Sequence, residues 1–376
     1  MDHAGRQRAL LAVVGALSLG TACTERVPLI SAGIQVEDAG TEPDAAPATD
    51  RPAAPDTGVD SGRHDRPEVK CMDVFQSHSF ELQYPEVVIA LDRSFSMFNH
   101  RPGGRSWWTA AREELLNYMR QTDGAIAYGY TEFPGRVTCD PGNGCCVRFG
   151  PSPSLNSHDG IEQRWQCNTQ SCFETTDESP SGHALARIRT FYDGEQAPVP
   201  DDRYVLLVTD GPPSCAADPN ECDYATSQAS RLFSMGGIKT IVLPLGDDAK
   251  NDSCLGDVAQ QGQTREPGAT TFPFAADTNQ LADELRKAMA PVEQRACRFR
   301  VKGDIKDREH FGLTVEFKPL PRDPTHKEGW DFDESGGPEL WLYGSTCKKL
   351  KCAQLDQGDL RSEENCTQCG STVVCQ

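Results

Sequence analysis

The apolar run Val87–Leu91 constrains the fold of this chain more than any other stretch. Consecutive apolar residues of this kind form a strand that is buried on both faces, as in a parallel sheet covered by helices. The run ends at Asp92 and passes into Ser94 and Ser96. Oxygen-bearing side chains beyond the carboxyl end of a buried strand suit a hard divalent cation, because ligands bind at that edge of open parallel sheets. The stretch therefore predicts a parallel sheet with a cation site at its edge.

Apolar strands alternate with amphipathic helices from Glu86 to about Ala290. After the first strand, the pattern predicts strands at Ala125–Phe133, Tyr204–Thr209, Ile238–Leu245 and Thr270–Ala275. It predicts helices at Trp107–Arg120, Gly182–Tyr192, Ala225–Met235 and Asn279–Ala290, the last with Asn279 as its N-cap. This alternation indicates an α/β fold with a doubly wound, mostly parallel sheet and helices on both faces.

Two further loops supply oxygen atoms that match those of the first. Asp210 follows the strand Tyr204–Thr209 in the segment VTDGPPS, and Ser179 stands directly before a predicted helix in ESPSGHAL. Together the segments resemble the von Willebrand factor A (VWA) domain and its metal-ion-dependent adhesion site, over roughly Glu86 to Val292. The resemblance implies that Asp92, Ser94, Ser96, Ser179 and Asp210 surround Mg²⁺, or Mn²⁺ or Ca²⁺ in its place.

The resemblance departs from the family pattern in the first loop. Phe95 stands where relatives commonly have glycine, and Ser179 replaces a threonine. Glycine adopts backbone conformations that phenylalanine does not, so the alternative is an intact fold whose metal site no longer works. Because every oxygen-bearing position is kept, we favour metal binding.

Further segments resemble a narrower group, the exported, cysteine-rich VWA proteins of myxobacteria and related bacteria. The matching segments are TEFPGRVTC (131–139), LVTDGPPSC (207–215), GIKTIVLPLG (237–246), CRFRV (297–301) and GWDFDESGGPELWLYGSTC (329–347). This likeness concerns location and architecture more than activity.

Composition and the N-terminus indicate export. The chain of 376 residues holds 16 cysteines, which predicts disulfides and an oxidising compartment, and its net charge of −19 argues against nucleic acid or anionic lipid as a partner. Residues 1–22 read as a signal peptide. Cys23 follows small residues as in a bacterial lipobox, which favours a surface lipoprotein, although cleavage after Ala22 also fits a periplasmic or secreted form. Residues 23–70 read as a disordered acidic linker, rich in Pro and Ala.

The cysteines divide the remainder of the chain. We expect a VWA domain at 71–297 with an irregular cysteine-rich insertion at about 137–176, and a small cysteine-rich β-containing module at 298–376. The ends of such domains lie close together, so the resemblance implies a Cys71–Cys297 disulfide. Cys215 and Cys222 bracket a short loop beside Asp210 and form a second candidate pair. Two interpretations remain for the cysteines of the tail, disulfides or a zinc site, the latter made by Cys347, Cys352, Cys366 and Cys369.

No catalytic signature is present in the sequence. It has no G-x-S-x-G elbow, H-E-x-x-H helix, phosphate loop or dinucleotide fingerprint. We therefore expect no enzyme but an adhesion or protein-binding module of the cell envelope, which captures a carboxylate of a protein or matrix polymer through its metal. The alternative is a structural or assembly protein of the envelope in which the metal is incidental or absent.

Overall fold

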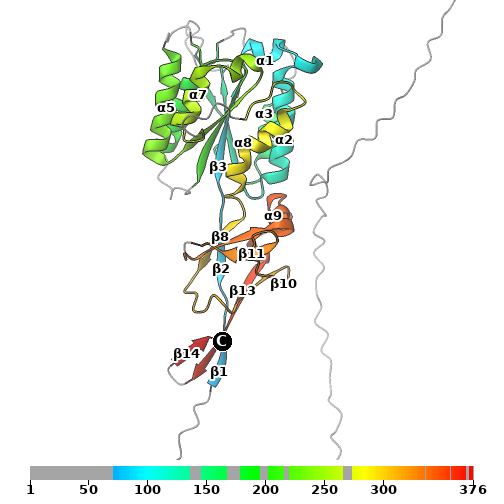
Figure 1. The fold of residues 1–376 in the computed structure, drawn as a ribbon, viewed down its shortest axis with the longest axis vertical. Helices are drawn as coiled ribbons and strands as arrows, with labels where there is room; N and C mark the ends of the chain where they lie inside the picture. Colours follow the sequence, from blue (N-terminus) through cyan, green and yellow to red (C-terminus); the bar gives the residue numbers. More distant parts are fainter. Residues whose placement is uncertain are drawn as a thin grey trace, which may run out of the picture.

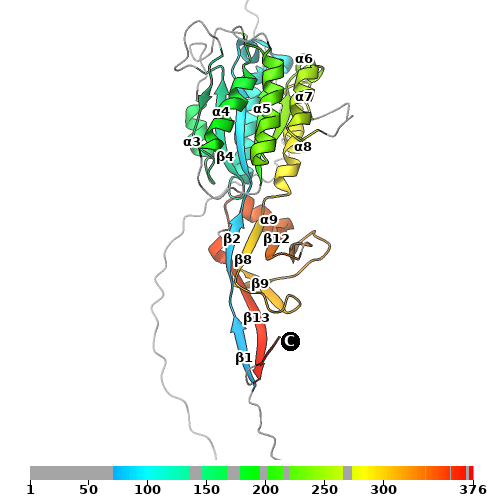
Figure 2. The ribbon, with the colours of Figure 1, turned by 90° about the vertical axis from the view of Figure 1, so that its left-hand side faces the viewer.

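The computed structural model describes residues 71–375 apart from 136–144, 167–177, 195–201, 216–219, 266–272, 335, 356 and 370–371. The predicted signal peptide, Cys23 and the linker lie outside the described residues. Figures 1 and 2 show two parts stacked along the long axis: a helix-covered sheet, here called the head, and an antiparallel β module below it. Among the described residues, no helix is both long and apolar enough to cross a membrane.

The head is built on a five-stranded sheet with the strand order β5-β4-β3-β6-β7. The central strand β3 (Glu86–Asp92) pairs in parallel with β4 (Ala127–Phe133) and with β6 (Arg203–Thr209). Strand β7 (Lys239–Pro244) continues the parallel order, and the short β5 (Arg148–Phe149) is the antiparallel edge. Every residue of β4 and β6 is buried, as expected for strands covered on both faces.

Helices cover both faces of this sheet (Figure 2). Val87, Ile89 and Leu91 pack towards α2 (Trp107–Thr122), α3 (His158–Arg164) and α8 (Leu281–Glu293). Val88 and Ala90 pack towards the other layer, which consists of α4 (Ser181–Asp193), α5 (Glu221–Gly236) and α7 (Ser253–Gln261). The short α1 (Phe95–Asn99) follows the carboxyl end of β3 and leads into η1 (Pro102–Gly104), and α6 (Asp247–Lys250) follows the carboxyl end of β7. The predicted doubly wound α/β fold is therefore confirmed.

Three predicted details of the head differ from the structure. Of the strand predicted at Thr270–Ala275, the described part contributes a single bridge between Ala275 and Leu245. Helix α8 begins at Leu281 with Gln280 as its N-cap, and not at Asn279. The insertion, predicted to be irregular, contains β5 and α3, because Ile161 and Trp165 are buried and Trp165 packs edge-on against Tyr130 at 5.6 Å.

The β module consists of two antiparallel sheets. The upper sheet has the order β11-β12-β8-β2, formed by Gly329–Phe332, Glu339–Tyr343, Arg298–Lys302 and Ser79–Gln83. The lower sheet has the order β1-β13-β9-β10 with β14 beside β13, formed by Cys71–Gln76, Leu360–Cys369, Phe311–Val315, Lys318–Leu320 and Thr372–Cys375. Helix α9 (Gly344–Lys351) lies next to the head and is followed by η3 (Gln357–Asp359) (Figure 1). Phe299, Trp330 and Leu340 continue the apolar core of the head into the module.

The first two strands belong to the module and not, as the sequence suggested, to the domain predicted at 71–297. Strand β1 pairs with β13, and β2 pairs with β8. The backbone of His78 between them donates to Ser362 Oγ, 284 positions away in sequence. Pairing over so long a separation leaves no local pattern, which explains why the boundary was misplaced.

Both predicted disulfides are wrong. Cys297 is bonded to Cys347, while Cys71 lies in β1 opposite Cys369 at the far end of the module. Cys215 is bonded to Cys145, and Cys222 to Cys254. Two of the four cysteines proposed as zinc ligands in the tail, Cys347 and Cys352, are disulfide-bonded and therefore cannot bind zinc as thiolates. Among the cysteines whose side chains the structure describes, none is free.

The Cys297–Cys347 disulfide should contribute strongly to thermal stability. It closes a loop with a sequence separation of 50 at the joint between head and module, worth about 4 kcal/mol on the chain-entropy model. Replacing both cysteines with serine should lower the melting temperature by several degrees without changing metal affinity, since the site described below lies at the opposite end of the head. Differential scanning calorimetry and metal titration of the double variant test both parts, and a matching loss of metal affinity would contradict the separation.

Candidate functional site

The carboxylate of Asp92 is the centre of the candidate site. It ends β3 and is fully buried. Its Oδ1 accepts a hydrogen bond from the Ser94 backbone N–H at 2.8 Å, and its Oδ2 accepts from Ser179 Oγ at 2.8 Å and Thr209 Oγ1 at 2.6 Å. The hydroxyls come from the segment directly before α4 and from the end of β6, so Asp92 ties three segments of the head together.

The serine hydroxyls of the first loop connect Asp92's loop to Asp210. Ser94 Oγ and Ser96 Oγ share a hydrogen bond of 2.9 Å, and Ser96 Oγ donates to Asp210 Oδ1 at 2.7 Å. The imidazole Nδ1 of His100 lies 3.2 Å from Asp210 Oδ2. All the ligands predicted from the sequence therefore belong to one hydrogen-bonded network at the carboxyl ends of β3 and β6.

Phe95 does not distort the first loop. It opens α1, and its φ is not among the positive values found at other non-glycine residues. A glycine is therefore not required at this position, which removes the main objection to the site. The loop is further held by Arg93, whose guanidinium lies 2.7 Å from the Glu132 carboxylate on the neighbouring strand, with both side chains buried.

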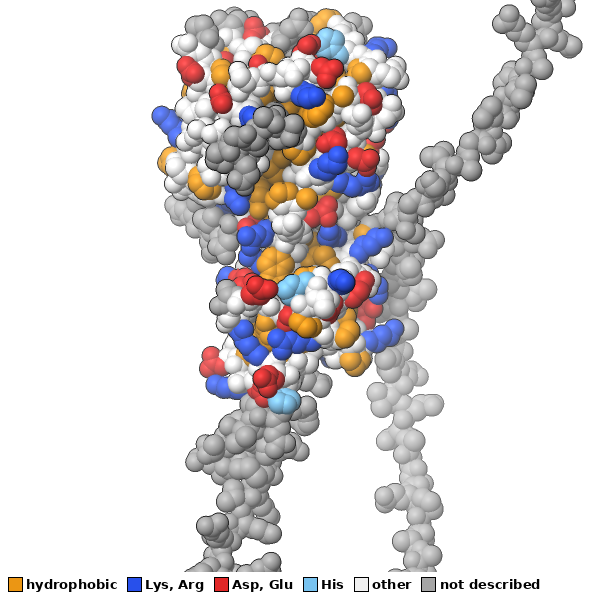
Figure 3. Space-filling view, in the orientation of Figure 1, with side chains coloured by type: hydrophobic (Ala, Val, Ile, Leu, Met, Phe, Trp, Pro, Cys, Tyr) orange, Lys and Arg blue, Asp and Glu red, His pale blue; other side chains and the backbone are white. Residues whose placement is uncertain are grey.

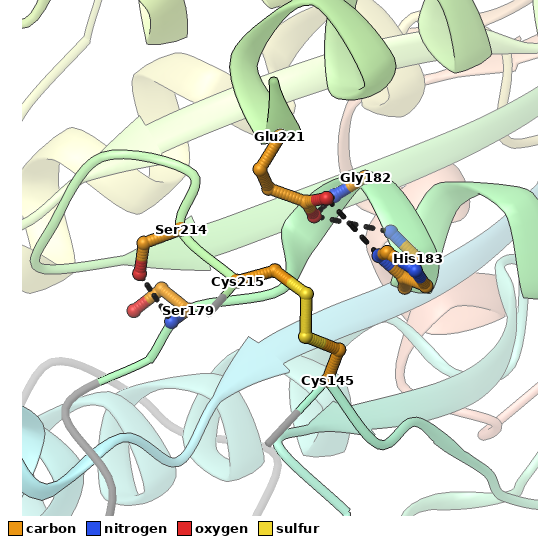
Figure 4. The surroundings of a disulfide bond; sticks show 7 residues. All are labelled: Cys145, Ser179, Gly182, His183, Ser214, Cys215 and Glu221. Atoms are coloured by element: carbon orange, nitrogen blue, oxygen red, sulfur yellow. Dashed lines mark hydrogen bonds and ion pairs between the residues drawn. A yellow bond between two sulfur atoms is a disulfide. The ribbon is translucent and has the colours of Figure 1, made fainter. Parts of the chain in front are cut away.

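The loop after Asp210 positions Ser179. Ser214 Oγ accepts a hydrogen bond from the Ser179 backbone N–H at 2.8 Å, and the next residue, Cys215, is bonded to Cys145 of the insertion (Figure 4). Ser179 is 3% exposed, and its hydroxyl points towards Asp92. The insertion is thus covalently attached to the loop that carries one predicted metal ligand and supports another.

Removing this disulfide should weaken metal binding. In a double variant Cys145→Ser and Cys215→Ser, the Asp210–Cys215 loop loses its covalent support. Ser214 is then no longer held in place to accept the hydrogen bond from the Ser179 backbone N–H. Loss of a group that orients a metal ligand typically reduces affinity about tenfold. Calorimetric titration with Mg²⁺ measures the effect, and the pair Cys297→Ser and Cys347→Ser, at the opposite end of the head, is the matched control. Equal affinities in the two double variants would contradict a positioning role for the disulfide.

Burial and charge repulsion perturb the two carboxylates. The pKa of Asp92 is raised to about 7, first by burial and then by the negative charge of Asp210, despite the opposing hydrogen bonds from Thr209, Ser94 and Ser179. The pKa of Asp210 is also raised by burial, and the hydrogen bond from Ser96 and the nearby His100 oppose the shift. Two buried carboxylates in one network are costly without a counter-charge.

These residues fit a hard divalent cation. The donors are carboxylate and hydroxyl oxygens, the ligand type that Mg²⁺, Mn²⁺ and Ca²⁺ take. A cation would supply one counter-charge to both buried carboxylates. Asp92, Ser94, Ser96, Ser179 and Asp210 would hold it directly or through water.

Sequence reasoning missed two members of the network. Thr209 directly precedes Asp210 at the end of an apolar strand, and this hydroxyl beside a strand-end carboxylate was a usable signal. His100 lies beyond α1 and carries no pattern that indicates contact with Asp210. A pocket of about 310 Å³ adjoins this side of the site, lined by His100, Arg101, Trp107, Asp210, Gly246 and Asp247 among others.

A second group of potential metal ligands lies nearby. One potential ligand atom each of His183, Cys215 and Glu221 lies within 4.8 Å of the others. The Cys215 sulfur is in a disulfide and offers no thiolate. Glu221 Oε1 accepts hydrogen bonds from the Gly182 N–H at 2.8 Å and the His183 N–H at 3.3 Å, as Figure 4 shows. The carboxylate therefore caps α4 and holds the helix that follows Ser179.

The solved structures that resemble this chain and are named here share little sequence with it. No protein-family model and no curated protein matches the sequence. Among solved structures, proximal thread matrix protein 1 of the mussel byssus matches at 12% identity and a TM-score of 0.39, covering 61% of this chain and 49% of that one. Manganese-loaded TRAP of Plasmodium vivax matches at 12% identity and 0.39, covering 72% and 96%.

A further match is the von Willebrand factor type A structure from Catenulispora acidiphila, at 12% identity and a TM-score of 0.39, covering 82% of this chain and 68% of that one. This chain spans about half the length of the mussel protein. At these scores and identities, the matches assign neither a family nor a function to the chain.

Proposed function

We propose that the head is a VWA-type, metal-dependent binding domain that captures a carboxylate of a partner protein or matrix polymer. One observation carries the proposal: Asp92, Ser94, Ser96, Ser179 and Asp210, from separate segments, converge in one oxygen-rich network. A cation held from one side by such a network keeps an open coordination position on the other. The acidic side chain of a partner would complete the coordination.

The position of the site on the molecule supports a role in contact with other molecules. Helix α1 lies at the upper end of the head, while β1 and β14 lie at the lower end of the β module (Figure 1). The pocket beside Asp210 gives room for a neighbouring side chain of the partner, with Trp107 as an apolar wall. In Figure 3, apolar side chains gather along the middle of the head above the joint, with charged side chains on either side.

We further propose that the protein is exported and tethered by a lipid on Cys23. The disulfides of the head and of the joint support an oxidising compartment. Labelling with a fatty-acid analogue, followed by mass spectrometry of the mature N-terminus, tests the lipid. An unmodified Cys23 at that terminus would identify a soluble periplasmic or secreted form.

Affinity capture from the native envelope, with and without a chelator, tests the binding function. The partner should be retained with Mg²⁺, released by EDTA, and retained again when Mg²⁺ is restored. The Asp210→Asn variant should capture nothing, while Asp283→Asn, an exposed change on α8, should capture as the wild type does. Capture that is unaffected by EDTA would favour the structural alternative, in which the head docks without its metal.

A further inference from the structure

The segment Gly329–Cys347, singled out in the sequence but unused by the metal site, lines a pocket at the joint between head and module. The pocket measures about 360 Å³, and its lining includes Phe332, Trp341, Tyr343, His326 and Glu334. In β12, Leu340 and Leu342 are buried, so Trp341 and Tyr343 lie on the opposite, accessible face of the strand. Trp341 and Tyr343 thus form one side of the pocket, here called the aromatic wall.

The aromatic wall is held rigidly. The imidazole of His326 stacks on Tyr343 with the ring centroids 4.8 Å apart and the planes 13° from parallel. His326 has a positive φ of 60°, and its turn is fixed by Asp323, whose carboxylate accepts hydrogen bonds from the backbone N–H groups of Thr325, Lys327 and Glu328. These hydrogen bonds stabilise the strained turn and so fix the His326 ring against Tyr343.

Carboxylates surround this wall. Asp333 and Glu334 line the pocket, and Glu334 has no ion-pair partner among the described residues. The pKa of Tyr343 rises to about 12, first because of burial and then because of Asp331, Asp333, Glu334 and Asp323. The phenol therefore senses the negative potential of several carboxylates.

Arg295, which itself lines the pocket, and Arg298 beside it share a carboxylate partner, Asp202. Arg295 lies 3.6 Å from Asp202, and Arg298 lies 2.8 Å from Asp202 and 3.5 Å from Glu339. The Arg298 guanidinium also lies 5.8 Å from the ring centroid of Trp341, so this indole already accepts a cation. Aromatic faces combined with carboxylates attract organic cations, because the ring quadrupole and the negative charge act together.

We propose that this pocket binds an alkylammonium group, independently of the metal site. The aromatic side chains Trp341 and Tyr343 would contact the alkyl substituents, and Glu334 would lie near the positive charge. Two kinds of ligand carry such a group: a quaternary ammonium compound such as choline, and a lysine side chain with its primary ammonium.

Calorimetric titration of the full chain in EDTA tests the proposal. The probes are choline, N-acetyl-lysine methylamide, and 3,3-dimethylbutan-1-ol, which is the neutral isostere of choline. At least one of the two cations should bind, and the alcohol should bind at least about tenfold more weakly. The tighter of the two cations identifies the source. Equal binding of choline and the alcohol, or no binding of either cation, would overturn the proposal.

Three variants locate the binding at this pocket. Trp341→Leu should weaken cation binding about tenfold, and Glu334→Gln, an exposed change that leaves the core intact, should weaken it several-fold. Tyr343→Phe keeps the aromatic face and should bind nearly as the wild type does. Unchanged affinity in Glu334→Gln and Trp341→Leu would place the cation elsewhere and overturn the assignment. Since EDTA is present throughout, failure here leaves the metal-dependent function untouched, and failure of that function leaves this result standing.

Discussion

Replacing Asp92 with asparagine should lower the affinity for divalent cations about a hundredfold or more. Loss of a group that only supports a metal ligand already lowers metal affinity about ten- to a hundredfold, and Asp92 is a proposed ligand itself. The substitution removes a negative charge from the centre of the network while keeping the size of the side chain. The amide also presents an N–H₂ group where Asp92 now accepts hydrogen bonds from Ser179 and Thr209. Calorimetric titration with Mg²⁺ and Mn²⁺ measures the loss.

The matched control for this variant is Asp283→Asn. Asp283 lies in the first turn of α8, and its side chain is 76% exposed. The affinity of the Asp283→Asn variant for Mg²⁺ should equal that of the wild type. Both variants should keep the wild-type far-ultraviolet circular dichroism spectrum. Undiminished Mg²⁺ binding by the Asp92→Asn variant would show that Asp92 is not a metal ligand and would contradict the proposed site.

The metal-free protein should become less stable as the pH rises from about 4 to 7. The pKa of Asp92 is raised from 3.8 to about 7 in the folded state, so the folded protein binds this proton more tightly than the unfolded chain. The stabilising contribution is complete below pH 3.8 and is lost as the pH rises through 7. A shift of this size corresponds to on the order of 4 kcal/mol, and other groups add their own dependence.

Denaturant unfolding in EDTA between pH 4 and 8 measures this loss. The difference between wild type and Asp92→Asn isolates the contribution of this carboxyl group, because the asparagine does not titrate. Saturating Mg²⁺ at pH 8 should restore stability to the wild type and have little effect on the variant. Parallel stability curves for the two proteins in EDTA would contradict the raised pKa of Asp92.

The head was predictable because its signals are local. Fully apolar runs such as Val87–Leu91 are needed wherever helices cover both faces of a sheet, and they specify parallel strands without further information. Once the strands are parallel, their carboxyl ends share one edge, so Asp92 and Asp210 were expected to approach each other. The hydrogen-bonded route from Asp92 through Ser94 and Ser96 to Asp210 agrees with that expectation.

The strand pairing within the module and the disulfide connectivity were not predictable, because they depend on distant pairings. Strand β1 finds its partner near the end of the chain, and only the folded sheet brings Cys71 opposite Cys369. Cys215 was assigned to Cys222 by nearness in sequence, while its bonded partner Cys145 lies 70 positions away. Cysteine spacing alone leaves many connectivities open, and nearness in sequence does not choose among them.

Strands β1, β2 and β3 follow one another along the long axis of the molecule (Figure 2). An extended chain rises about 3.3 Å per residue, so the path from Cys71 to Asp92 covers roughly 70 Å with almost no slack. A pull between the N-terminal side of β1 and a molecule held at Asp92 would run straight along this backbone. Such a line lengthens very little before it transmits load, so the molecule would act as a stiff rod that passes tension directly from β1 to any partner bound at Asp92.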